Sequence, residues 1–356
     1  TSIRSDELVP DHGAKLVWPL ESKSEASLLK YYLRTLAPWF DYCDPQQHFR
    51  TYIANNTATD ITLLYAVLAV SARHQSKSLK TQSHIADEYQ KRCLIVLIAM
   101  EEPPEAGICT HTLSAQLLLR IREGHVSHSS FADAAFIVIL RQEIYVANVT
   151  QRPVGNFVDH CNIDTGLGPT SERMWALRAM AHAAKATDLA YGDDAPSSRS
   201  QWSTLMEYIE DWERLCPESF RPVYYQDRVS ASNPFPHMWY AHDYHAAARQ
   251  HIELARVLLL ASNSQSCFAR MRQTRMGCSN DERIRDSVRV ICGVSMSNPE
   301  FVPAGIAAGL VIAVIGELFD DPTETKILLD LLSDAEAHLG WPSLKVKEHL
   351  QGLWRL

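Results

Sequence analysis

Residues 28–74 read LLKYYLRTLAPWFDYCDPQQHFRTYIANNTATDITLLYAVLAVSARH, and the second half of this stretch decides the fold. Residues 61–72 are apolar around nearly the whole circumference of a helix, because only Thr62 and Ser71 interrupt them. A helix without a polar face has to be surrounded by other helices. This segment is therefore predicted to be a buried helix that is central to the fold.

The residues before it supply the start signals of two helices. Asp60 directly precedes the buried segment and is predicted to be its N-cap. Asp44 followed by Pro45 marks the start of a short helix at residues 46–53, with proline at the first helical position. The stretch thus predicts an amphipathic helix, a tight turn, a short helix and a buried helix, as in an all-α domain.

Helical patterns continue through the rest of the chain. Further helices are predicted at residues 83–100, 110–121, 131–149, 170–190, 198–215, 236–261, 281–297, 303–319, 322–339 and 343–354. The start of the helix at 322–339 resembles a capping box, formed by Asp321 and Glu324.

The chain shows no run of alternating β-branched residues and no repeat of fixed length. We therefore predict one large all-α domain of about a dozen helices over residues 24–356. A polar tail at residues 1–23 precedes it.

The composition limits the classes of function. Apolar residues make up 46% of the chain, which is enough for a large core. The formal net charge of −8 argues against a nucleic-acid surface, since phosphate binding needs clustered lysine and arginine.

The cysteines argue against a zinc site. The eight cysteines never come closer than eleven residues apart, so no CxxC pair exists. Single cysteines on apolar helices are typical of small buried side chains in a reducing compartment.

Membrane and secretion signals are absent from the sequence. The start shows no signal-peptide pattern, and the longest uncharged run is residues 301–316. That run is shorter than the ~20 residues of a membrane span and is predicted to be a core helix. The chain begins with Thr1, which we interpret as the start of a fragment or a trimmed protein.

Six segments carry a resemblance to a known family. They are LAPWFDYCDPQQHF (36–49), LLYAVLAVSARH (63–74), ADEYQKRCLIVLI (86–98), AAFIVILRQEIYVANVTQRPV (134–154), VRVICGVSMSN (288–298) and HLGWPS (338–343). Together they resemble the fungal-specific transcription factor domain, the regulatory or middle homology region of fungal zinc-cluster regulators. The resemblance covers about residues 28–354, and RQEIY with QRP is its most distinctive part.

The resemblance implies a role in transcription. It implies an α-solenoid-like packing of helices, a nuclear location and control of a metabolic gene set, secondary metabolism included. DNA would be bound only by a zinc cluster upstream of residue 1, so we expect no cofactor within this chain. A hydrophobic small-molecule effector is the expected partner, a homodimer is a second, and no membrane is expected.

One region is predicted to hold that effector. Its walls are predicted to be Trp175, Trp202, Trp239 and His242, on three helices rich in alanine and aromatic residues. Arg141, inside an otherwise apolar helix, is the predicted anchor for an anionic group. The alternative is that the aromatic residues form ordinary core and that Arg141 belongs to an ion-pair network that docks helices.

A histidine pair in the same region admits a second interpretation. His242 and His245 are three residues apart on one helical face, a spacing that metal sites use. A third ligand is missing, so we predict no metal and add His245 to the residues near the organic ligand. The sequence contains no phosphate-binding glycine loop and no GxSxG or HExxH motif.

Three functions stay open at this point. The first is the regulatory domain of a transcription factor, and the second is a metabolite-binding protein or enzyme on the same all-α scaffold without a DNA-binding half, then located in the cytoplasm. The third is a protein-interaction scaffold, which a large exposed apolar patch would favour. The upstream coding sequence separates the first two, because only the first requires a six-cysteine cluster followed by a basic linker.

Overall fold

The computed structural model of the chain describes residues 18–78, 84–99, 130–192, 198–229, 233–263, 280–339 and 343–354. Most of the predicted tail and the predicted helix at residues 110–121 lie outside the described residues. Within them, helices dominate, and the predicted all-α class is confirmed.

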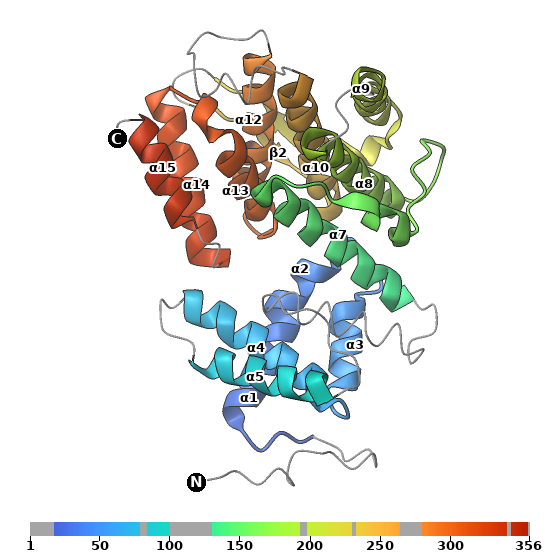
Figure 1. Cartoon of the computed structure of the whole chain (residues 1–356), viewed down its shortest axis with the longest axis vertical. Helices are drawn as coiled ribbons and strands as arrows, with labels where there is room; N and C mark the ends of the chain where they lie inside the picture. Colours follow the sequence, from blue (N-terminus) through green and yellow to red (C-terminus); the bar gives the residue numbers. More distant parts are fainter. Residues whose placement is uncertain are drawn as a thin grey trace.

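Two groups of helices lie one above the other, and α7 (Ser130–Thr150) runs between them (Figure 1). The N-terminal group contains α1 (Lys23–Tyr31), the π-helical turn η2 (Tyr32–Leu36), α2 (Ala37–Asp41), α3 (His48–Asn56), α4 (Ile61–Ser78) and α5 (His84–Ala99). The C-terminal group contains η3 (Gly155–Cys161), α8 (Glu172–Tyr191), α9 (Ser198–Leu215), η4 (Glu218–Phe220), β1 (Tyr224–Gln226), β2 (His237–Trp239), α10 (Asp243–Asn263), α12 (Asp281–Ser297), α13 (Ala304–Ile315), η6 (Gly316–Leu318), α14 (Pro322–Leu339) and α15 (Leu344–Trp354).

Helix α4 is the buried helix that the sequence predicts. Val67 and Leu68 have no exposed surface, and the predicted cap is present, since the Asp60 carboxylate accepts the backbone N–H groups of Thr62 and Leu63 at 3.0 and 3.1 Å. The helix packs on α1 and α5 in the N-terminal core. Its predicted place at the centre of the whole fold is wrong, because the larger core forms around α8 and α10 instead.

Small side chains let α8 and α10 approach each other closely. Ala179, Ala183 and Ala186 of α8 are fully buried, as are Ala248 and Ala255 of α10. Helices α12 and α13 then cover α10. Alanine at these positions leaves room for the two helix backbones to lie close together.

Helix α7 contributes side chains to both cores. Phe131 and Val138 lie in the N-terminal core, whereas Leu140 and Ile144 lie in the C-terminal core. The two groups meet again where α14 contacts α4, and there Nε2 of His74 lies 3.0 Å from the carbonyl oxygen of His338. The helical groups are therefore joined through α7 and through the contact between α4 and α14.

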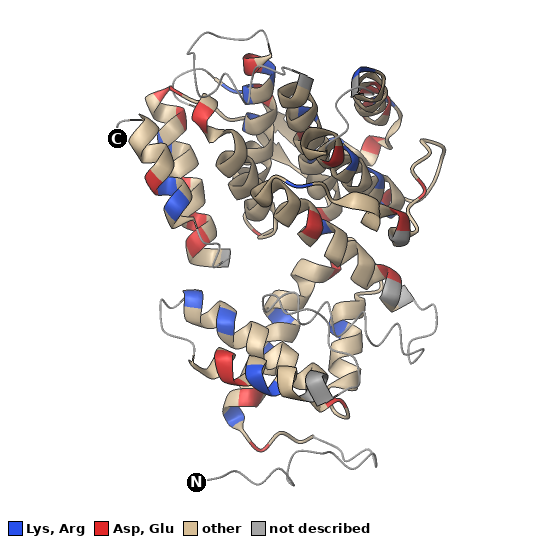
Figure 2. Cartoon of the chain, viewed as in Figure 1, with Lys and Arg blue, Asp and Glu red and all other residues tan. Residues whose placement is uncertain are grey.

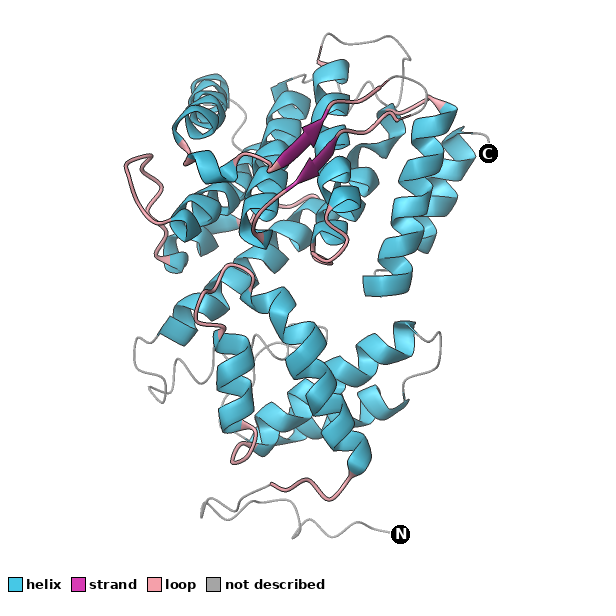
Figure 3. Cartoon of the chain, turned by 180° about the vertical axis from the view of Figure 1, so that it is seen from behind, coloured by secondary structure: helices cyan, strands magenta, loops and turns pink. Residues whose placement is uncertain are grey.

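The short strand β2 interrupts the predicted helix at residues 236–261, and its partner β1 lies before that segment. Strands β1 and β2 pair antiparallel, with Tyr224 opposite Trp239 and Gln226 opposite His237 (Figure 3). The helix begins only at Asp243, so its predicted start is wrong. Contacts that are distant in sequence hold β2 in place: the backbone N–H of Met238 donates to the Ser297 hydroxyl at 3.2 Å.

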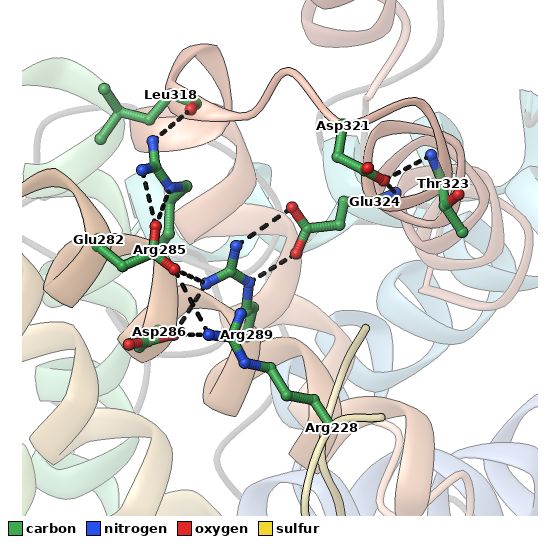
Figure 4. A network of polar contacts seen from close by, with 9 residues as sticks. All are labelled: Arg228, Glu282, Arg285, Asp286, Arg289, Leu318, Asp321, Thr323 and Glu324. Atoms are coloured by element: carbon green, nitrogen blue, oxygen red, sulfur yellow. Dashed lines mark hydrogen bonds and ion pairs between the residues drawn. The ribbon is translucent and has the colours of Figure 1, made fainter. Parts of the chain in front are cut away.

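A charged network fixes α12 against the start of α14 (Figure 4). The buried Arg289 donates to both carboxylate oxygens of the buried Glu324, at 2.6 and 3.2 Å, and also to Glu282 at 2.7 Å. The hydrogen bond from Arg289, aided by Arg285, lowers the pKa of Glu282 to about 2 against the opposing effect of burial.

The same network explains why the predicted capping box is only half formed. Asp321 accepts the backbone N–H groups of Thr323 and Glu324 at 2.9 and 3.0 Å, as predicted. The side chain of Glu324, however, turns to Arg289.

Each helix in the described part of the chain is too short or too polar to span a membrane.

Candidate functional site

The six residues predicted to hold a ligand come from five parts of the fold. Arg141 lies in α7, Trp175 in α8, Trp202 in α9, Trp239 in β2, His242 directly before α10 and His245 in its first turn. The structure brings the two histidines together and connects Trp175 to them through other rings. It places Arg141, Trp202 and Trp239 in separate surroundings.

His245 contacts a carboxylate at the start of α8, and His242 lies beside His245. The Glu172 carboxylate accepts the Tyr244 hydroxyl at 2.8 Å and the Ser219 hydroxyl at 2.5 Å. Nε2 of the buried His245 lies 3.2 Å from Oε2 of the same group. The His242 ring stands edge-on to His245 at 5.3 Å between centroids.

These contacts set the charge state of the cluster. The hydrogen bonds from Ser219 and Tyr244 lower the pKa of Glu172, so the carboxylate is ionised at neutral pH. Burial lowers the pKa of His245, although Glu172 opposes this effect. Nδ1 of His245 is buried without a hydrogen-bonding partner. The cluster is thus a buried neutral histidine that hydrogen-bonds to a partly exposed, ionised glutamate.

Trp175 is part of the core next to this cluster. Its backbone carbonyl accepts the indole N–H of Trp212 at 3.1 Å, and the two rings pack edge to face. The Trp212 ring in turn packs on Phe220, whose centroid is 4.3 Å from that of His245. Trp175, Trp212 and Phe220 therefore belong to the C-terminal core.

Arg141 docks α7 onto α2. Its guanidinium donates to the carbonyl oxygens of Trp39 and Phe40, at 3.5 and 3.1 Å, and lies over the Tyr42 ring at 4.1 Å from its centroid. These contacts dock helices, as the alternative interpretation expects, but they are made to carbonyl groups and a ring and not to the carboxylates of an ion-pair network. The ion pair of this region is between Glu143 and Arg152, at 2.7 Å.

Trp202 and Trp239 lie away from the histidines. The indole N–H of Trp202 donates to the carbonyl of Leu259 at 2.7 Å. Leu259 follows His245 by fourteen residues, which is about 20 Å along α10. Trp239 is 51% exposed and packs on Tyr224 across the hairpin, so its predicted place on a helix is wrong.

The described part of the chain offers few residues that could bind a metal ion or react as a thiol. There, no group of three or more histidine, cysteine or acidic side chains is placed to hold a metal ion. Cys43, Cys93, Cys161 and Cys292 are buried free thiols, and burial raises the pKa of Cys43 to about 12. The absence of a cofactor stays a prediction.

The N-terminal group contains a groove that was not predicted from the sequence. It has a volume of about 700 Å³ and lies between residues 18–20, α1, η2 and α3. Lys30, Arg34 and Arg50 line it together with apolar side chains. The sequence contains one sign of this groove: the cations at positions 30 and 34 are four residues apart and lie beside leucines at positions 29 and 33, which have the same spacing.

Comparison with family models gives one match. The model described as the fungal specific transcription factor domain matches residues 27–218, more than half of the chain. Four of the six segments that carry the resemblance lie inside the match, and those at residues 288–298 and 338–343 lie beyond it. No curated protein and no solved structure matches the chain. The extent of the family match shows that the chain belongs to the fungal-specific transcription factor domain family, and so has a transcription-regulatory role.

Proposed function

We propose that this domain receives a small-molecule effector for a nuclear transcription factor that controls a metabolic gene set, secondary metabolism included. DNA is contacted through another domain of the protein. The observation that carries the proposal is the family match over residues 27–218. Pairing with a second copy stays a prediction.

The charge distribution supports a regulatory role for this part of the protein. The net charge is −8, and charged residues of both signs are interspersed along the helices (Figure 2). Many arginines are paired with carboxylates, as Arg178 is with Asp164 and Arg249 with Glu213. A surface that binds DNA instead clusters cations, so recognition of the promoter belongs elsewhere.

The connection between the two cores supports signal reception. A receiver has to transmit the state of one region to another, and this requires elements that both regions share. Helix α7 supplies side chains to both cores, and Arg141 binds α7 to α2 near the middle of its length. A change in the N-terminal group therefore has a direct structural path to the C-terminal group.

A reporter assay tests the proposal. The chain is fused to a heterologous DNA-binding domain in yeast, and transcription of a reporter is measured over a panel of carbon and nitrogen sources. We expect the fusion to change reporter output several-fold in at least one condition. The DNA-binding domain alone and a fusion carrying Ile312→Asp, which places a charge at a fully buried position, serve as controls.

Equal output from the fusion and from the DNA-binding domain alone, in every condition, would contradict the proposal. An output that is the same in every condition but far above that of the DNA-binding domain alone would support transcriptional activity and contradict the reception of an effector.

A further inference from the structure

We propose that the groove between α1, η2 and α3 binds an apolar organic anion of small-molecule size, with its apolar part in the groove and its anionic group at Lys30, Arg34 and Arg50. This inference rests on the proposed effector-receiving role and names the site and the chemical class of the effector.

The groove has three walls. Residues 18–20 form one wall with Trp18 and Leu20, α1 and η2 form the second, and α3 forms the third. Leu29 and Leu33 come from the second wall and Ala54 from the third. Viewed from behind, α1 and α3 lie on the near side of the N-terminal group (Figure 3). All of these lining side chains are apolar, so the groove favours a ligand that needs to leave water.

Spacing along the helices brings the cations to the same groove. Lys30 and Arg34 are four residues apart, and so lie on one face of the continuous α1–η2 segment. Arg50 stands four residues before Ala54 on α3, across the groove. The second wall also contains the π-helical turn η2, a rare conformation that recurs at functional sites.

The described part of the chain supplies no counter-charge to these three cations. Among the described residues, none of Lys30, Arg34 and Arg50 has a hydrogen-bonding or ion-pair partner for its side chain, and no carboxylate lines the groove. Arg249 and Arg289, by contrast, are paired with carboxylates. Uncompensated cations beside an apolar surface select an anion, since guanidinium groups bind carboxylates in bidentate fashion.

The size of the groove favours a small molecule as its occupant. Its volume of about 700 Å³ lies within the range of small-molecule sites, roughly 300–1,000 Å³. The helical face from Ala26 to Arg34 extends for about 12 Å. An alkyl carboxylate of medium length fits both the apolar walls and the cations.

Calorimetric titration of the purified 356-residue chain tests this inference. The probes are decanoate, decanol and decyltrimethylammonium, which share an alkyl chain and differ in charge. We expect decanoate to bind at least tenfold more tightly than decanol, and the cationic probe not to bind. Raising the salt from about 0.1 M to about 1 M should weaken decanoate binding, because the screening length falls from roughly 10 Å to 3 Å.

Two variants locate the site. The triple variant Lys30→Gln, Arg34→Gln, Arg50→Gln should weaken decanoate binding at least tenfold and leave decanol binding unchanged. A control triple variant, Arg199→Gln, Arg283→Gln, Lys326→Gln, changes the net charge equally at exposed positions outside the groove and should bind decanoate as the wild type does. Ala26→Trp, which fills the groove from an exposed position, should abolish binding of both decanoate and decanol.

Absence of decanoate binding, or equal binding to the wild type and the groove triple variant, would overturn the inference. Equal affinity for decanoate and decanol would overturn the anionic part of it. The reporter assay tests the proposed function separately. Decanoate binding together with a reporter output that does not change between conditions would support the site and contradict the regulatory role. A reporter output that changes, without decanoate binding, would contradict only the site.

Discussion

At the scale of single residues, the interior of the domain contains charged side chains whose partners cannot be identified from the sequence. Glu324 is an example, since its position after Asp321 predicted a capping box. The first half of that prediction is confirmed, because the cap depends on neighbours in sequence. The partner of the Glu324 side chain is Arg289, which is 35 residues away in the chain, so no local pattern could have identified it.

Removal of one member of this buried pair should be costly. We expect Glu324→Gln to lower the free energy of unfolding by about 3 kcal/mol, because Arg289 would be left buried with a weaker partner. Urea unfolding measures the change. Glu348→Gln, at an exposed position of α15, is the control and should stay within about 0.5 kcal/mol of the wild type. A loss as small as that of the control would show that Glu324 is not held as Figure 4 places it.

Asp41 gives a pH-dependent prediction. Its buried carboxylate accepts the backbone N–H groups of Phe49 and Arg50 at 2.8 and 2.9 Å at the start of α3. Burial raises its pKa to about 6, from a usual value of 3.8, although these hydrogen bonds act in the opposite direction. Between these values the folded state binds more protons than the unfolded state, so the contribution of Asp41 to stability falls as the pH rises.

The comparison with Asp41→Asn isolates this effect. The stability of the wild type relative to the variant should fall by on the order of 2 kcal/mol between about pH 4 and pH 6, and change little above that range. Urea unfolding of both proteins at each pH measures it. A relative stability that stays constant, or that rises with pH, would show that the carboxylate is not buried in this way.

At the scale of elements, the sequence predicted helices best where one periodic pattern ran between two clear ends. The predicted bounds of α9, α12 and α14 match the structure, and those of α7 differ by one residue at each end. The helix predicted from residue 236 failed because its first residues pair with β1 and with side chains of α12. A short aromatic segment carries no local sign of such distant partners, and tertiary contacts override its propensity.

The packing of β2 on α12 depends on Gly293. A Cβ atom at this position would collide with the backbone carbonyl of Pro236. We therefore expect Gly293→Ala to destabilise the domain by about 1–3 kcal/mol, since the hairpin has to move away from α12. Gly352→Ala is the matched control, because a Cβ atom there meets nothing within 4 Å.

Thermal unfolding with a near-ultraviolet signal measures both glycine variants. The control should be neutral or slightly stabilising, as alanine favours a helix more than glycine does. A Gly293→Ala variant as stable as the control would mean that the hairpin does not lie this close to α12.

At the scale of the whole molecule, the sequence indicated the fold class and the family but not the arrangement of two cores. The all-α class followed from helical periodicity, and the family from segments now matched over residues 27–218. The groove was missed because it depends on how residues 18–20 lie against α1 and α3, which no helical pattern specifies. Of the three tryptophans predicted to line a ligand site, Trp175 lies in the core and Trp202 packs against it, whereas Trp239 is exposed.

The charge of the whole chain predicts its behaviour with DNA. At a net charge of −8, we expect the chain alone to show no sequence-specific DNA binding in a gel-shift assay. A fusion with a zinc-cluster domain serves as the positive control. Specific, salt-sensitive retardation of DNA by the chain alone would show a nucleic-acid surface that the account does not contain.

We expect the two cores to unfold together as one cooperative unit, because α7 and the contact between α4 and α14 join them. Native-state hydrogen exchange over a series of low urea concentrations measures this most directly. The account predicts that the most protected amides of α4 and of α10 open with the same free energy and the same dependence on urea. Amides of α4 that open at a distinctly lower free energy, with a smaller dependence on urea, would show that the N-terminal core unfolds by itself and would contradict the claim.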